Sequence, residues 1–211
     1  MLLRKITQNK STNYQITKST TMKDLFGKAI LDFQTNNSPE DLITETTISD
    51  EDEMSVAYLF RDFSGMPKLE QQALLLSKGK VLDVGCGAGS HSLFLQNEKS
   101  LEVTAIDISN NAVEACQLRG ISDVSRTDIL EYKSDEKFDT ILLLMNGTGI
   151  FGKIENVSKY LQKLKSLLSE NGQILIDSSD LSMPSCVLAS TLSTRIPKSQ
   201  PISKKLSSLR V

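Results

Sequence analysis

The sequence is short of several residue types on which other classes of protein depend. It has no tryptophan, one histidine and three cysteines among 211 residues. The cysteines, Cys86, Cys116 and Cys186, lie far apart and form no CxxC pair, so the sequence predicts neither a disulfide framework nor a zinc site. No apolar run approaches the roughly 20 residues needed to span a bilayer. We therefore expect a globular protein of the reducing cytoplasm, with no bound metal and no membrane partner.

The near-neutral net charge of -2 hides an uneven distribution of charge. Residues 1–21 hold four basic residues and residues 181–211 hold five, and neither segment has an acid. The body between them, residues 22–180, holds 15 basic residues against all 26 acids, a net charge of -11. Because phosphate binding depends on clustered Lys and Arg, an acidic body argues against a nucleic-acid partner.

Both ends differ from the middle in kind as well as in charge. The first 21 residues are rich in Ser and Thr and poor in core-forming residues, so they predict a disordered extension. Residues 181–211 have no acid, no aromatic residue and no strand alternation, and predict an atypical, disordered tail.

Residues 22–79 are predicted to form an N-terminal helical cap region. Apolar residues recur at helical spacing between Asp24 and Gln34, and two further helical segments are expected within AYLFRDF and PKLEQQALLL. The acidic run from Ser49 to Glu53 is expected to be a solvated loop or a helix start.

Beyond Gly79, short apolar runs alternate with amphipathic segments. The runs KVLDV, LEVTAIDI, KFDTILLLM and QILIDSS are typical of buried strands, and SHSLFLQN, NNAVEACQLRG and the segment from Ile154 to Leu168 are typical of helices, the last ending at Asn171 and Gly172. Parallel strands joined by helices predict an α/β fold with a doubly wound, mostly parallel sheet over residues 80–180. Ligands of such sheets bind at the carboxyl ends of the strands.

The turn after the first of these strands, DVGCGAGS, has glycine at positions 85, 87 and 89. Glycine permits positive φ and a close approach of ligand to backbone at the following helix N-terminus. The spacing excludes a Walker phosphate loop, which needs GxxxxGK[ST], and it departs from the dinucleotide fingerprint GxGxxG because Ser90 occupies the expected place of the third glycine. A nucleotide-type cofactor remains open at this point.

DVGCGAG after an apolar strand resembles the glycine motif of class I S-adenosylmethionine-dependent methyltransferases, written [DE]xGxGxG in that family. Further features follow in the family's order: LEVTAIDIS ends its strand in Asp107, SRTDILEY places Asp128 after the next, and FDTILLLMNGTG and LKSLLSENGQILID resemble the fourth and fifth strands with their flanking segments. The resemblance covers residues 80–178. It implies a Rossmann-like fold, methyltransferase activity and S-adenosylmethionine as cofactor.

Chemistry and resemblance together suggest a role for each position. Asp107 lies 22 residues past Gly85, and its two carboxylate oxygens can accept hydrogen bonds from both ribose hydroxyls. The resemblance implies that Ile108 covers the adenine and that Asp128 and Ile129 contact its edge. It also implies that Asp83 and the glycine loop meet the methionine ammonium end, and that Met145 and Asn146 flank the sulfonium and the acceptor. The predicted cofactor-binding residues are Asp83, Gly85, Cys86, Gly87, Ala88, Gly89, Asp107, Ile108, Asp128, Ile129, Met145 and Asn146.

Other residues have two interpretations each. An Asp at a strand end can simply cap a turn. His91 is either a general base or, as we favour, a polar residue in the first turn of a helix. Tyr58, Phe60 and Arg61 lie where many family members fold over the cofactor, and Arg61 can pair with the methionine carboxylate, but ordinary helix packing explains the two aromatic residues equally well and a solvated side chain is the default for Arg61. We assign no catalytic residue, because methyl transfer consists largely of holding a nucleophile in line with the methyl group.

The methyl acceptor is predicted only by class. Nucleic-acid amino methyltransferases are expected to carry [DN]PP[YFW] after the fourth strand, whereas this chain has Met145, Asn146, Gly147 and Thr148, which offer no platform for a flipped base. A small-molecule acceptor is therefore favoured, with a protein acceptor as the next choice.

Two alternatives to an active methyltransferase stay open. One is an NAD-type nucleotide-binding oxidoreductase, which the glycine turn and Asp107 also allow. The other is a truncated or frame-shifted, inactive cofactor-binding fragment. Family members usually continue through another helix and a closing antiparallel hairpin, and residues 181–211 do not predict such a hairpin.

Overall fold

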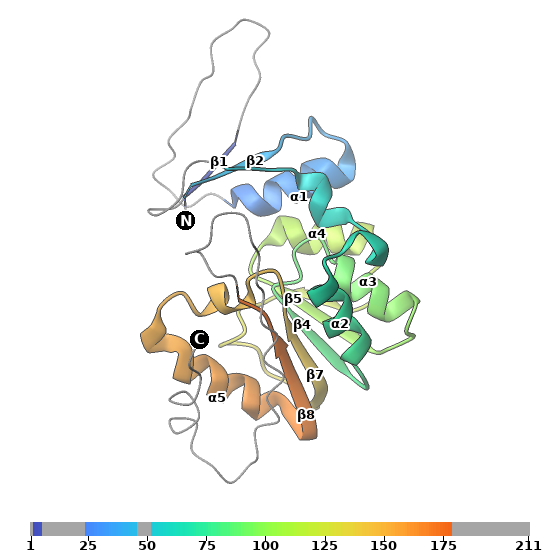
Figure 1. The fold of residues 1–211 in the computed structure, drawn as a ribbon, viewed down its shortest axis with the longest axis vertical. Coiled ribbons are helices and arrows are strands. Elements are labelled where there is room, and N and C mark those ends of the chain that lie inside the picture. The colour runs from blue at the N-terminus through green and yellow to red at the C-terminus, as the bar shows by residue number, and fades with distance from the viewer. Residues whose placement is uncertain (1, 6–23, 46–51, 179–211) are drawn as a thin grey trace, which may run out of the picture.

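The computed structural model describes residues 2–5, 24–45 and 52–178 (Figure 1). Its centre is a parallel five-stranded sheet in the order β6-β5-β4-β7-β8. The strands are β4 (Val81–Val84), β5 (Val103–Asp107), β6 (Val124–Arg126), β7 (Phe138–Leu143) and β8 (Leu168–Ile176). The chain builds outward from β4, first through β5 and β6 and then in the other direction through β7 and β8. The strand order therefore reverses between β4 and β7, where a ligand site is expected.

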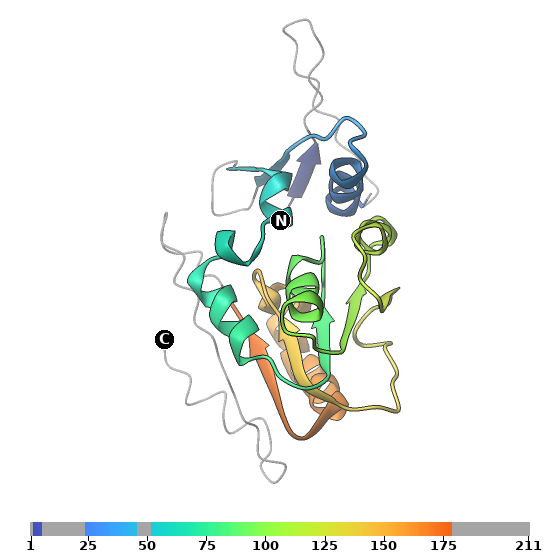
Figure 2. The same ribbon diagram turned by 90° about the vertical axis from the view of Figure 1, so that its right-hand side faces the viewer.

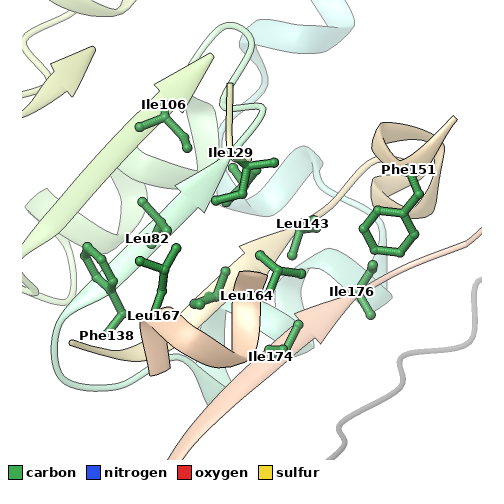
Figure 3. Close-up of a cluster of buried hydrophobic side chains, with 12 residues drawn as sticks. Leu82, Ile106, Ile129, Phe138, Leu143, Phe151, Leu164, Leu167, Ile174 and Ile176 are labelled. Carbon is green, nitrogen blue, oxygen red and sulfur yellow. The ribbon is translucent and has the colours of Figure 1, made fainter. Parts of the chain in front are cut away.

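The predicted doubly wound fold is confirmed by the way alternate residues of each strand face opposite layers. On one face, Leu82, Leu143 and Ile174 pack with Leu164 and Leu167 of α5 (Val157–Leu167), as Figure 3 shows. On the other face, a second cluster joins the sheet to α2 (Lys68–Leu76) and α3 (Ser90–Asn97), and α4 (Asn110–Leu118) packs beside them. Both faces of the sheet are thus buried, as its continuous apolar strands require.

The N-terminal cap contains strands as well as the predicted helices. It comprises α1 (Leu25–Thr35), the 3-10 helices η1 (Val56–Phe60) and η2 (Phe63–Gly65), and an antiparallel sheet of β1 (Leu2–Lys5), β2 (Leu42–Glu45) and β3 (Asp52–Met54). The expectation of a disordered start is thus wrong for Leu2–Lys5, because this segment completes the backbone hydrogen bonding of β2. Residues 6–21 lie outside the described residues.

The cap lies over the carboxyl ends of the parallel strands (Figure 2). Asp24, at the N-terminus of α1, accepts hydrogen bonds from the Gly27 N–H at 2.9 Å, from Ser109 Oγ at 2.5 Å and from Asn111 Nδ2 at 3.0 Å. Ser90 Oγ donates to the Leu59 carbonyl at 2.7 Å. Two contact points therefore join the cap to the beginnings of α3 and α4, on either side of the glycine loop.

The predicted helix between Ile154 and Gly172 divides into three elements. Ile154 begins a separate 3-10 helix, η4 (Ile154–Asn156), and is 84% exposed, so it does not belong to the apolar face. The helix α5 ends at Leu167 rather than at Asn171, because residues from Leu168 onward pair with β7 across a register irregularity. The tail expected after residue 180, and with it the predicted absence of a closing hairpin, lies outside the described residues.

None of the helices in the described part of the chain has both the length and the apolar character that a bilayer span requires.

Candidate functional site

The glycine loop connects β4 to α3 at the carboxyl edge of the sheet. The N–H groups of Gly85 and Cys86 both donate to the Ile106 carbonyl, at 2.8 and 3.1 Å, which ties the loop to β5. Gly87 and Gly89 both have positive φ, +54° and +78°. A Cβ on Gly89 would overlap Ile121 and lie 2.9 Å from Cys116 Sγ, whereas a Cβ on Gly87 would meet nothing within 4 Å. Gly89 is therefore required for packing against α4, and Gly87 lies beside open space.

Asp107 ends β5 with its carboxylate against the glycine loop. Its Oδ2 accepts a hydrogen bond from the Gly87 N–H at 2.9 Å, and its Oδ1 accepts one from the Ser109 N–H at 2.9 Å. Burial raises the pKa of Asp107 above its ordinary value, and these two N–H groups only partly oppose the rise. Because each carboxylate oxygen has a second lone pair, both can also accept a hydroxyl proton, as binding a ribose diol requires.

Asp83 lies beneath the loop and is 2% exposed. Its Oδ2 accepts a hydrogen bond from Ser92 Oγ at 2.6 Å, which fixes the first turn of α3 to β4. Burial is the main reason that the pKa of Asp83 is raised, and the nearby charge of Asp107 adds to it. In the structure Asp83 thus stabilises the loop from below, and contact with the methionine ammonium end stays a prediction.

The residues predicted for adenine differ in how they are placed. Ile108 is 69% exposed beside Asp107, so its side chain is available to cover a ring. Asp128 follows β6, and its Oδ1 accepts a hydrogen bond from the Leu130 N–H at 2.7 Å, so it caps a turn. The Thr127 N–H donates to the Asp107 carbonyl at 2.8 Å, which brings these two segments together. The Ile129 side chain is buried in the core against the sheet, so this residue can contact a ligand only through its backbone.

Two other loop positions also have packing side chains. Cys86 lies in a buried cluster with Cys116, their Sγ atoms 3.8 Å apart, and both thiols are free. Ala88 packs against the cap, in the cluster that contains Ile30 and Val56. These two residues can therefore contribute to a ligand site only through their backbone groups.

Met145 and Asn146 follow β7 and both have left-handed backbone conformation, with φ of +61° and +65°. Met145 is 40% exposed and Asn146 is also exposed. The next turn, η3 (Gly147–Phe151), returns the chain to the glycine loop, where Ile150 Cδ1 would lie 3.1 Å from a Cβ on Gly85. The structure thus brings the turn after β7 next to the glycine loop, and contact of Met145 and Asn146 with the sulfonium stays a prediction.

Sequence reasoning missed Asp177, which directly follows β8. Its Oδ2 accepts a hydrogen bond from the Met145 N–H at 2.9 Å and its Oδ1 accepts one from the Gly147 N–H at 2.8 Å. Asp177 therefore holds the turn that contains Met145 and Asn146. Its position at a strand end, like that of Asp107, was the signal that could have identified it.

A buried charged cluster joins the cap to α3. Glu70 Oε2 lies 2.5 Å from Arg61 Nη2 and 2.8 Å from His91 Nε2, and all three side chains are at most about a tenth exposed. Arg61 Nη1 also donates to the Tyr58 carbonyl at 2.5 Å, and the guanidinium carbon lies 3.9 Å from the centre of the Tyr58 ring. Burial favours protonation of Glu70, but its interactions with His91 and Arg61 outweigh this and lower its pKa. His91 lies in the first turn of α3 and has Glu70 as its partner there.

These residues fit S-adenosylmethionine. Gly87 leaves room beside the backbone, and Asp107 offers two acceptors next to it. Among the buried side-chain N and O atoms of residues 24–45 and 52–178, Arg61 Nε has no hydrogen-bond partner, so a guanidinium donor remains for an anionic group. No group of three or more His, Cys, Asp and Glu side chains in the same residues could hold a metal ion.

Comparisons with known proteins agree with this geometry. A family model described as a methyltransferase domain matches residues 75–207. The structure of an S-adenosylmethionine-dependent methyltransferase from Bacteroides fragilis in complex with S-adenosyl-L-homocysteine is 44% identical, with a TM-score of 0.70; the similarity covers 78% of this chain and 68% of that one. The sugar N-methyltransferase KedS8 from a Streptoalloteichus species, 16% identical with a TM-score of 0.52 over 67% of this chain and 61% of that one, shares the fold. No curated protein sequence matches the chain.

The comparisons decide between the two cofactors that the glycine spacing had left open. The family match includes the whole parallel sheet, and the structure of the Bacteroides relative holds the demethylated cofactor. The chain therefore belongs to the class I S-adenosylmethionine-dependent methyltransferases, and S-adenosylmethionine is its cofactor.

Proposed function

We propose that this methyltransferase methylates a small molecule. The observation that carries the proposal is the composition of the turn after β7, where Met145 and Asn146 are exposed and no aromatic residue offers a surface for a flipped base. The net charge of -11 over residues 22–180 also disfavours a polyanionic acceptor. We place the enzyme in the cytoplasm, where the thiols of Cys86 and Cys116 stay reduced.

The proposed cofactor placement follows the carboxyl edge of the sheet. Asp107 receives the ribose hydroxyls, Ile108 and Asp128 contact the adenine, and Gly85 and Gly87 meet the methionine portion. Met145 and Asn146 flank the sulfonium. The cofactor supplies a methyl group on a sulfonium that is already a good electrophile, so the protein's contribution is to bind, orient and exclude water.

Arg61 is proposed to bind the methionine carboxylate. Glu70 and Tyr58 hold the guanidinium in place, and Glu70 in turn contacts His91, two residues after Gly89. A buried donor without a partner, as Arg61 Nε is, costs about 1–3 kcal/mol. A ligand carboxylate would satisfy that donor and form a charge-assisted hydrogen bond.

Equilibrium binding tests the cofactor placement at Arg61. The Arg61→Met variant is expected to bind S-adenosylhomocysteine about tenfold or more weakly, as loss of one hydrogen bond to a charged group implies. Its affinity for 5′-methylthioadenosine, which lacks the amino-acid portion, should be unchanged. Equal losses for both ligands would show that Arg61 acts through the fold of the cap and not on the carboxylate.

The acceptor is tested by incubating the enzyme with methyl-labelled S-adenosylmethionine and a cell extract separated by molecular mass. We expect the label in the low-molecular-mass fraction, sensitive neither to protease nor to nuclease. Label that enters protein or nucleic acid instead would overturn the proposed acceptor class and leave the cofactor assignment intact.

A further inference from the structure

Asp177 has a role beyond ending its strand. Its own N–H continues the sheet by donating to the Leu143 carbonyl at 3.2 Å, and its carbonyl accepts from the Thr148 N–H at 3.2 Å. The carboxylate is therefore not needed for pairing β8 with β7. Both its oxygens are instead used for the N–H groups of Met145 and Gly147, at 2.9 and 2.8 Å.

The turn that this carboxylate holds is strained. Met145 and Asn146 are consecutive non-glycine residues in the left-handed region, at φ of +61° and +65°. Such a conformation is costly for L-residues and persists only where the surroundings enforce it. Gly147 adds a second constraint, because a Cβ there would lie 2.6 Å from the Leu143 Cβ. The Asp177 carboxylate is the group that enforces the turn from below.

Keeping an acid at this position also has a cost. Asp177 is 6% exposed, and burial raises its pKa despite the opposing N–H groups of Gly147, Met145 and Asn146. The charge of Glu70, in the cluster with Arg61 and His91, raises it further. The Asp177 carboxylate therefore contacts the turn after β7 and lies near enough to Glu70 to be affected by its charge.

We propose that Asp177 is a positioning residue for methyl transfer, holding Met145 and Asn146 in the left-handed turn that presents them to the sulfonium. The inference rests on the proposed placement of the cofactor. In this proposal Asp177 does not contact the cofactor. It affects only the methyl-bearing part of the cofactor, through the turn that it holds. The adenosine portion lies with Asp107 and Ile108, on the other side of β4.

S-adenosylmethionine and S-adenosylhomocysteine separate this role from a general structural one, because they differ only in the methyl group and its positive charge. Asp177→Asn can accept at only one atom, so the turn loses one of its two charge-assisted hydrogen bonds. We expect affinity for S-adenosylmethionine to fall about tenfold more than affinity for S-adenosylhomocysteine, the magnitude of that one lost hydrogen bond. Both affinities are measured by calorimetry, so no acceptor is needed.

Asp139→Asn is the matched control. Asp139 also joins β7 to its neighbours, accepting from Ser169 Oγ at 2.7 Å and from the Lys80 N–H at 3.0 Å, but it lies at the opposite end of the strand. We expect this variant to keep the native ratio of the two affinities. An unchanged ratio in Asp177→Asn as well, whether neither affinity falls or both fall equally, would overturn the proposal.

Hydrogen exchange in the unaltered protein keeps the proposal testable if Asp177→Asn does not fold. The amides of Met145 and Gly147 should be protected in the free enzyme, and S-adenosylmethionine should protect residues 144–151 more than S-adenosylhomocysteine does. Unprotected amides, or equal protection by the two ligands, would contradict it. Failure of the underlying cofactor placement is recognised separately, because neither ligand would then lose affinity when Asp107 is replaced.

Discussion

Glu70 and Arg61 form an ion pair that is closed off from solvent: Oε2 lies 2.5 Å from Nη2, and each side chain is less than a tenth exposed. The pair joins α2 to the segment that follows η1. Because the same oxygen lies 2.8 Å from His91 Nε2, it also joins both to the start of α3. One carboxylate thus contacts both the segment after η1 and the first turn of α3, in addition to the contacts that Asp24 and Ser90 make between the cap and the core.

Replacing Glu70 with alanine is expected to lower the free energy of unfolding by about 3–5 kcal/mol, because it leaves the buried cation of Arg61 unpaired. Urea denaturation measures the loss. Glu114, exposed on α4, provides the control, and its replacement should change stability by no more than about 0.5 kcal/mol. Similar small losses for both variants would show that the Glu70 ion pair adds nothing to the fold.

The same carboxylate predicts a dependence of stability on pH. The folded-state pKa of Glu70 is lowered, so its ionised form is favoured by folding, and its contribution is present above the unfolded value. Stability should therefore fall as the pH drops below about 4.3, the ordinary pKa of glutamate, toward the lower folded value. The Glu70→Gln variant should lack this part of the acid-induced loss. Parallel stability curves for variant and unaltered protein between pH 5 and the acid limit would contradict the assignment.

Replacing Gly89 and Gly120 allows the cost of overpacking to be distinguished from the cost of backbone strain. Both have positive φ, +78° and +90°, but a Cβ on Gly89 would overlap Ile121, whereas one on Gly120 would meet open space. We expect Gly120→Ala to cost about 1–2 kcal/mol from strain alone. Gly89→Ala should cost about 2–5 kcal/mol, because overpacking against Ile121 and Cys116 adds to the strain. Equal costs, measured by urea denaturation, would show that these two side chains move aside without penalty.

Much of the sheet and of the glycine loop could be predicted because the signals are local. The strands β4, β5 and β7 are short apolar runs, the turn carries its glycines within five positions, and Asp107 ends its strand at the expected distance. The start of α4 has a local signal as well, because Ser109 directly precedes the helix and its Oγ accepts from the Ala112 N–H at 3.0 Å.

The remaining features depend on contacts between segments far apart in the chain. Glu70 meets His91 across 21 residues, and no pattern at that spacing distinguishes it from a solvated acid. The strand Leu2–Lys5 forms only because β2 offers an unpaired edge some 40 residues later. The end of α5 was misplaced because the residues after Leu167 have helical spacing, yet pairing with β7 gives their backbone groups better partners.

Asp107→Asn should weaken binding of S-adenosylhomocysteine about 10- to 100-fold, because asparagine offers one acceptor where the ribose hydroxyls require two. Loss should also follow protonation in the unaltered enzyme. Burial raises the pKa of Asp107. As the pH is lowered, affinity for S-adenosylhomocysteine should therefore begin to fall at a pH above about 3.9, the ordinary pKa of aspartate. Calorimetry at several pH values measures both effects.

Asp123→Asn is a suitable control for this prediction. Asp123 accepts a hydrogen bond from Thr104 Oγ1 of β5 at 2.7 Å, so it too contacts β5, but near the amino end of the strand. Its replacement removes a carboxylate that contacts the same strand and should leave affinity within about twofold, the range of additive, distant effects. If both variants bind S-adenosylhomocysteine like the unaltered protein, Asp107 does not bind the ribose. If both variants weaken binding equally, the loss of affinity comes from a change in the sheet, because only a direct contact with the cofactor would make the two ends of β5 differ.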